Sequence, residues 1–377
     1  MKIVFGYRAL QERMGRVLCV LVGLTAALLL GIALRGALRP SDPADAAIYL
    51  RLADEQGFKR AAALNPQSSA AWMGLGLIEE NRGNAGQAQR DLSRAVALDR
   101  GYLPLWTLAN FHLRHADARA WPLLSDALGV AVKGNQQTAA LFETCWQFRP
   151  EPDFLLRKVV GRSPEALRAY LTYLLEANRA DQLLAPAQLL AETHGKQDEQ
   201  LLLRASDTML ASGDAPGARQ IWKYVEPDYL PGELLVNTEF KLPRQLAFDW
   251  RYNSIPESRI TFGGLAQFDF SGKQPDPLEL LFETVLLKSG TYLLTWDARQ
   301  TAAQSQAGLF WQVTETHSGA QLFHHGVSST VDWKPESAQF QLQSSALVRL
   351  ALHTARPFGS TRFEGTVWLR HPSLKLK

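Results

Sequence analysis

The sequence predicts a multidomain chain with three different parts: a transmembrane helix, an all-α stack of helical repeats and an all-β jelly-roll sandwich. Three observations predict this: a long uncharged stretch near the N-terminus, self-similarity at an interval of 34 residues, and short alternating segments toward the C-terminus. A length of 377 residues suits two folded domains of about 100–200 residues each. The predicted bounds are 1–16 for a cytoplasmic tail, 17–38 for the transmembrane helix, 42–228 for the repeats and 233–377 for the sandwich.

Composition excludes several classes of protein. Hydrophobic residues make up 46% and charged residues 20% of the chain, which excludes a wholly disordered protein. The formal net charge is only +3, and no run of five or six like charges occurs, so nucleic-acid binding has little electrostatic support. Two cysteines exclude a disulfide-built scaffold and a cysteine-rich zinc module.

The N-terminal stretch predicts a membrane anchor. Residues 17–34 are eighteen consecutive uncharged residues, and the span 17–38 is long enough to cross a hydrocarbon core of about 30 Å. Four basic residues precede it, which favours a cytoplasmic N-terminus. The prediction is a single-pass inner-membrane protein with its bulk in the periplasm. A cleaved signal peptide stays open, because residues 44–46 have the A-x-A form of a cleavage site, and so does a soluble core helix.

The segment that follows repeats itself with helical spacing. Trp72 begins a W-x2-L-G sequence and recurs 34 residues later as Trp106. Small residues at fixed positions let two antiparallel helices approach, and large residues fill the groove against the next pair. The signature positions are Trp72, Gly76, Gly83, Ala88, Ala95 and Trp106.

These positions resemble the tetratricopeptide repeat. The resemblance implies about five helix pairs between residues 42 and 225, although Gly129–Pro164 does not follow the repeat phase. Arrays of this kind present a curved groove that commonly holds a peptide or a partner protein. A spacer that lifts the C-terminal part off the membrane is the alternative.

The C-terminal segment has a period of two. Eight or nine short segments, the first of them LLVNTEF at 234–240, are separated by Gly, Ser and Pro clusters, which predicts an antiparallel sandwich. Because side chains alternate between the faces of a strand, Trp311 is expected in the core. In the last segment Val367 and Leu369 are expected to point inward and Trp368 outward.

An outward tryptophan beside arginines suggests sugar binding. A sugar ring offers CH groups that stack on an indole and hydroxyls that suit Arg, Asp, Gln and Asn. Packing at a sheet edge is the alternative for the tryptophans, and an exposed ion pair with Asp297 is the alternative for Arg299. The candidate glycan-binding residues are Trp250, Arg251, Trp333, Trp368 and Arg299.

The layout also resembles a group of bacterial membrane-anchored tetratricopeptide proteins. These end in a carbohydrate-binding-module-like jelly roll and occur with exopolysaccharide or exosortase systems. The matching residues are Asn237, Phe240, Phe248–Arg251, Ser289–Tyr292, Arg299, Gly308–Val313, Trp333 and Gly365–Trp368. The resemblance implies a non-catalytic adaptor for assembly or export of a surface polysaccharide, either exopolysaccharide or O-antigen. A pair of acids expected after Trp368 is replaced by Leu369 and Arg370.

No catalytic or cofactor motif is present. The sequence lacks H-E-x-x-H, G-x-S-x-G, a phosphate-binding loop and a dinucleotide fingerprint. His112 and His115 have helical spacing but no evident third ligand, so no metal is expected. The prediction is a protein without enzyme activity or cofactor. Two alternatives stay open: a structural assembly factor whose sandwich binds protein, and a glycan-modifying hydrolase. The acids available to such a hydrolase are Asp249, Glu257, Asp269, Glu279, Glu283, Asp297 and Glu364.

Overall fold

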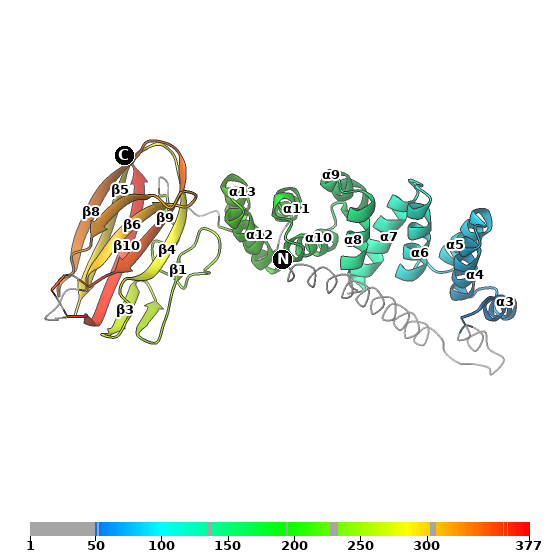
Figure 1. Cartoon of the computed structure of the whole chain (residues 1–377), viewed down its shortest axis with the longest axis horizontal. Helices are drawn as coiled ribbons and strands as arrows, with labels where there is room; N and C mark the ends of the chain where they lie inside the picture. The colour runs from blue at the N-terminus through cyan, green and yellow to red at the C-terminus, as the bar shows by residue number, and fades with distance from the viewer. Residues whose placement is uncertain are drawn as a thin grey trace, which may run out of the picture. The chain divides into compact units, whose positions relative to one another are not determined.

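The computed structural model confirms a helical region followed by an antiparallel β-sandwich (Figure 1). It describes residues 50, 53–134, 138–193, 195–226, 233–301, 307–356, 358–359 and 361–377. The described chain forms two compact units, and the boundary between them in the sequence falls between Gly161 and Arg162. The predicted tail at 1–16 and the predicted transmembrane helix at 17–38 lie outside the described residues. Among the helices that are described, none is both long enough and apolar enough to cross a bilayer.

The first unit is built from paired helices that follow the predicted repeat. Its helices are α3 (Glu55–Leu64), α4 (Ser69–Asn81), α5 (Ala85–Leu98), α6 (Tyr102–Arg114), α7 (Ala120–Lys133), α8 (Ala139–Phe148) and α9 (Pro152–Leu155). Gly83 joins α4 to α5 with a φ of 81°, a conformation that glycine adopts without steric cost. Ala88 and Ala95 of α5 are fully buried, as the repeat signature requires.

Contacts at the repeat interval link one helix pair to the next. The Thr107 hydroxyl of α6 lies 3.3 Å from the Met73 sulfur of α4. Arg114 of α6 donates to both carboxylate oxygens of Glu80 on α4, at 2.7 and 2.6 Å. Both pairs are 34 residues apart, so equivalent positions of successive repeats face each other.

The two signature tryptophans lie partly exposed on this unit. The Trp72 ring packs against the buried cluster at the start of the repeats, and its Nε1 donates to the Pro66 carbonyl at 3.0 Å. The Trp106 ring stacks on that of Tyr102 at 6.0 Å. Beyond α8 the repeat phase is lost, because α9 runs directly into a π-helix at Leu156–Val160, and the wider turn shifts the side chains that follow.

The second unit begins with four α-helices and continues into the sandwich. The helices are α10 (Pro164–Glu176), α11 (Leu184–Glu192), α12 (Glu199–Ala211) and α13 (Ala215–Val225). The strands are β1 (Arg251–Tyr252), β2 (Ser258–Phe262), β3 (Ala266–Ser271), β4 (Leu278–Leu287), β5 (Gly290–Gln300), β6 (Leu309–Glu315), β7 (Gln321–Gly326), β8 (Lys334–Leu342), β9 (Ala346–Thr354) and β10 (Glu364–Leu376). One sheet has the order β1-β4-β9-β6-β7 and the other β2-β3-β10-β5-β8, with antiparallel neighbours throughout.

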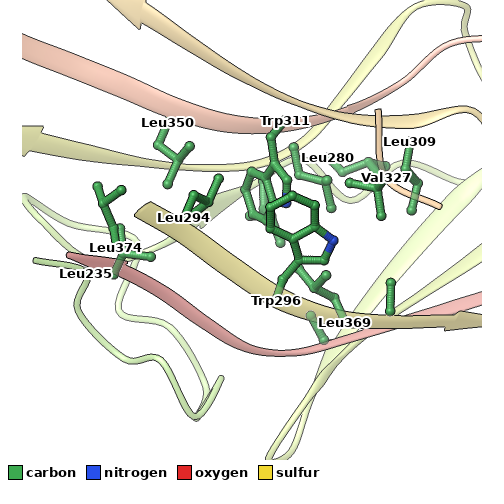
Figure 2. Packing of buried hydrophobic residues seen from close by; sticks show 14 of the residues in the cluster. Leu235, Leu280, Leu294, Trp296, Leu309, Trp311, Val327, Leu350, Leu369 and Leu374 are labelled. Atoms are coloured by element: carbon green, nitrogen blue, oxygen red, sulfur yellow. The ribbon is translucent and has the colours of Figure 1, made fainter. Parts of the chain in front are cut away.

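The core of the sandwich lies between the two sheets. Trp296 of β5 and Trp311 of β6 come from opposite sheets and meet edge to face, with ring centres 6.1 Å apart (Figure 2). Both are buried, and so are Val367 and Leu369 of β10. The inward faces predicted from the alternation are therefore confirmed. Burying these large apolar side chains provides the main driving force that holds the sheets together.

The first predicted strand was wrong. Residues 234–240 lie outside the named strands, although Leu235 and Phe240 are buried in the core. Leu234 N donates to the Leu374 carbonyl of β10 at 3.0 Å, but the next two backbone N–H groups donate to carboxylates. Leu235 N donates to Glu233 at 3.1 Å, and Val236 N donates to Glu283 of β4 at 2.8 Å.

Candidate functional site

The outer face of the β2-β3-β10-β5-β8 sheet brings three sequence-predicted residues together. Trp368 of β10 lies opposite Arg299 of β5. Ala298 of β5 pairs with Lys334, so the preceding Trp333 lies beside Arg299, just before β8. Trp368 and Arg299 are partly exposed while their sequence neighbours are buried. Their side chains therefore point away from the core, as the alternation predicted for Trp368.

Indole and guanidinium groups alternate on this face. The Arg299 Cζ lies 4.5 Å from the ring centre of Trp368 and 4.9 Å from that of Trp333. The Arg370 Cζ lies 4.1 Å from the same Trp333 ring. All three distances are in the range of cation–π interactions. We refer to Trp368, Arg299, Trp333 and Arg370 as the tryptophan–arginine row.

Hydrogen bonds from neighbouring strands hold the row in place. Trp368 Nε1 donates to the Gln267 amide oxygen of β3 at 3.1 Å. The Gln267 amide nitrogen donates to the Asp269 carboxylate at 3.0 Å, and the Thr366 hydroxyl donates to the same carboxylate at 2.7 Å. The indole of Trp368 is thereby fixed against β3 as well as against Arg299, so the surface is ordered before any ligand arrives.

The two arginines of the row differ in their charge partners. Arg370 Nε donates to the Asp297 carboxylate at 2.9 Å, and His371 Nδ1 lies 3.3 Å from the same carboxylate. The structure thus pairs Asp297 with Arg370, and not with Arg299 as the alternative interpretation of the sequence had it. Arg299 makes no ion pair with any residue that the structure describes, and its buried Nε has no hydrogen-bond partner there.

The other two sequence-predicted candidates lie elsewhere. Trp250 is fully buried in the sandwich core, with its ring 6.3 Å from that of Trp311. A sugar cannot stack on a ring that has no exposed surface, so Trp250 is a core residue. Arg251 forms an ion pair with Asp207 of α12, and Ala247 N donates to that carboxylate at 2.8 Å. Asp207 therefore joins α12 both to Arg251 at the start of β1 and to the segment that precedes it.

The opposite outer face carries an aromatic cluster that the sequence analysis missed. The Phe310 ring of β6 lies between His324 of β7, at 4.5 Å, and His353 of β9, at 5.2 Å and nearly parallel. Beside it, Arg349 of β9 donates to both carboxylate oxygens of Glu279 on β4, at 2.9 and 2.5 Å. The alternation in β6 placed Phe310 opposite the core residue Trp311. Only the pairing of β6 with β7 and β9 shows its histidine neighbours.

Two of the acids considered for hydrolysis lie buried near the start of the sandwich. Burial raises the pKa of Asp249, against the effect of hydrogen bonds from the Arg244 and Trp250 backbone. Burial also raises the pKa of Glu283 well above its ordinary value. Among the described residues, no group of three His, Cys, Asp or Glu side chains is arranged to hold a metal ion.

A cleft of about 450 Å³ opens beside Asp249. Acidic and basic side chains are mixed along it, and Asp249 there accepts hydrogen bonds from the Arg244 and Trp250 N–H groups at 2.7 and 2.8 Å. The lining residues are Glu226, Glu233, Leu235, Val236, Asn237, Thr238, Glu239, Lys241, Leu242, Arg244 and Asp249. The buried carboxylate thus serves as an acceptor that orders the wall of the cleft.

No family model matches the chain, and no curated protein matches it. Among solved structures, a CBM4 module is 12% identical with a TM-score of 0.30, covering 38% of this chain and 99% of its own. The CBM22-1 xylan-binding domain of Paenibacillus barcinonensis Xyn10C is 14% identical with a TM-score of 0.24, covering 34% and 85%. YrrB, a tetratricopeptide repeat protein with an unusual peptide-binding site, is 14% identical with a TM-score of 0.24, covering 47% and 95%.

Proposed function

We propose that this chain is a non-catalytic adaptor whose sandwich binds a glycan on the outer face of the β2-β3-β10-β5-β8 sheet. One observation carries the proposal. Residues from the separate segments around Trp333, β5 and β10 form a partly exposed row of two indoles and two guanidinium groups. The core of the sandwich does not require these groups, because they lie on its outer side.

The chemistry of the row suits a sugar chain. Indole surface accepts the CH groups of a pyranose ring, and guanidinium N–H groups donate to hydroxyl or carboxylate oxygens. The order already present around Trp368 reduces the conformational entropy lost on binding. The side-chain amide of Gln267 and the carboxylates of Asp269 and Asp297 surround the row and supply further polar contacts.

The helical repeats give the adaptor its second function. In this proposal they hold a partner protein, the stretch at 17–38 anchors the chain in the inner membrane, and the described residues lie in the periplasm. The sandwich then keeps the partner near a surface polysaccharide, exopolysaccharide or O-antigen, during its assembly or export. The contacts between equivalent positions of successive repeats, such as Arg114 with Glu80, support an ordered array of the kind that binds peptides.

Affinity electrophoresis in gels that contain polysaccharide tests the site. Trp368→Ala should weaken retardation about tenfold, equivalent to about 1.4 kcal/mol of binding free energy, because the variant removes an indole that the core does not use. Phe310→Ala is the matched control on the opposite outer face and should leave retardation unchanged.

Three outcomes would contradict the proposal. Equal retardation of Trp368→Ala and the unaltered protein would exclude the tryptophan–arginine row as the binding site. Loss of binding in Phe310→Ala alone would place the ligand on the other sheet. Turnover of a labelled polysaccharide by the purified protein would contradict the non-catalytic part.

A further inference from the structure

Arg299 differs from the other charged members of its surface. Its guanidinium lies near two indole rings, at 4.5 and 4.9 Å, and forms neither an ion pair nor a hydrogen bond with the residues that the structure describes. Arg370 is neutralised by Asp297 at 2.9 Å, and Asp269 accepts hydrogen bonds from neutral groups. Arg299 is therefore the one guanidinium of the row that has no ion-pair partner among the described residues.

The surroundings of Arg299 restrict what can compensate that charge. Indole rings interact with the flat faces of a guanidinium, whereas its N–H donors point outward in the plane of the group. The fork of two parallel N–H groups matches the two oxygens of a carboxylate in a planar, bidentate arrangement. Partial burial strengthens such a contact, because the guanidinium is already partly removed from water.

We propose that Arg299 selects an acidic glycan by binding the carboxylate of a uronic acid residue. The inference rests on the proposed glycan site and adds the substrate class. The indoles of Trp368 and Trp333 contact the sugar ring, and Arg299 receives its carboxylate. Trp368 is therefore needed for any glycan, whereas Arg299 decides between acidic and neutral ones.

The test compares two sets of oligosaccharides that differ in one group of each sugar ring, a carboxylate in one set and a primary alcohol in the other. The full-length protein is titrated with polygalacturonate oligosaccharides and with the same oligosaccharides after reduction of their carboxyl groups to alcohols. The unaltered protein should bind the acidic form about tenfold or more tightly than the reduced form, since a charge-assisted pair adds to the contacts that both forms make. The preference should shrink as salt concentration rises.

Three variants assign the preference to one residue. Arg299→Gln should bind both forms with the affinity of the reduced form, and Arg299→Lys should keep part of the preference because it retains the charge without the fork. Arg259→Gln is the matched control: Arg259 is an exposed arginine of β2 on the same outer face, and its loss should leave the preference intact. Melting temperatures of all variants report whether the fold is kept.

Each outcome separates this inference from the proposed function. Equal binding of both forms by the unaltered protein would overturn the acidic selectivity and leave the glycan site standing. No binding of either form, together with no binding in the polysaccharide gels, would overturn both. A preference that survives in Arg299→Gln would also refute the role of Arg299. Equally tight, Arg299-dependent binding of dextran sulfate would show recognition of charge alone and overturn the assignment to a carboxylate.

Discussion

Glu283 projects from β4 into the interior of the sandwich, where 1% of its surface is exposed. One carboxylate oxygen accepts the Val236 N–H at 2.8 Å, and the other has no hydrogen-bond partner among the described residues. Burial raises its pKa well above the ordinary value of 4.5, and the nearby carboxylates of Asp249 and Glu233 raise it further. Its charged form is therefore disfavoured in the folded state.

This raised pKa makes stability depend on pH. The folded state binds the Glu283 proton more tightly than the unfolded chain does, so this stabilising contribution is fully present below about pH 4.5. It is lost as pH rises from there through the folded-state pKa. Glu283→Gln should remove that loss and raise the free energy of unfolding at pH 8 by about 1–3 kcal/mol.

Urea denaturation between pH 4 and pH 8 measures this effect. Glu364→Gln is the matched control, because Glu364 is exposed and its substitution should leave the pH dependence as it is. A stability curve for Glu283→Gln that falls as steeply with pH as that of the unaltered protein would show that Glu283 titrates normally.

The sequence predicted the position of a single residue well where the period of two determined it. It predicted the position poorly where contacts with residues distant in the sequence determined it. The period of two placed Trp311 in the core and Trp368 on the outside, and both placements are confirmed. It could not show that Trp368 reaches Gln267, 101 residues away, because that contact depends on strand pairing. Trp250 was misplaced for the same reason, since no alternating strand pattern surrounds it.

At the scale of elements, the pair α4 and α5 depends on the absence of a side chain at Gly76. A Cβ built there would lie 2.6 Å from the Leu92 Cγ and 3.2 Å from the Ala88 carbonyl oxygen. Gly76→Ala should therefore push the helices apart and lower the free energy of unfolding by about 1–3 kcal/mol. Gly129→Ala should do the opposite, because nothing lies within 4 Å of that site in α7 and alanine favours a helix by about 1 kcal/mol.

Thermal unfolding followed by circular dichroism compares the two alanine variants. A lower melting temperature for Gly76→Ala and an unchanged or higher one for Gly129→Ala are expected. Similar melting temperatures would mean that α4 and α5 accommodate the added methyl group without loss of stability. Packing of the two helices would then not require glycine at position 76.

The repeat pattern predicted these helices because their contacts are local. It failed between residues 129 and 164, a range whose last part holds the four-residue helix α9 and the π-helix at Leu156–Val160, which interrupts the α-helical spacing. A single turn with a different hydrogen-bond interval shifts every side chain after it. A pattern search at fixed intervals cannot follow such a shift, although both flanking segments are helical.

At the scale of the whole molecule, the second unit joins helices to strands through a short, densely bonded segment. Phe248 is fully buried and meets Trp222 of α13 edge to face at 5.9 Å, while the Arg219 guanidinium lies 5.0 Å from its ring. Arg244 forms ion pairs with Glu199 and Glu226. From this buried aromatic contact and these ion pairs we expect α12, α13 and the sandwich to open together.

Hydrogen exchange of the full-length protein, followed by mass spectrometry, tests this cooperation. Peptides from α12 and α13 should exchange with the same opening free energy as those from β4 and β9, as segments of one cooperative unit do. Phe248→Ala should lower the opening free energy of α12 and α13 by about 3–5 kcal/mol and that of the strands by less. The helices and the strands would then no longer open as one unit. Phe154→Ala, which removes the contact with Trp121 in the first unit, should change neither. Helices that already exchange independently in the unaltered protein would show that the segment around Phe248 connects them without coupling their stability.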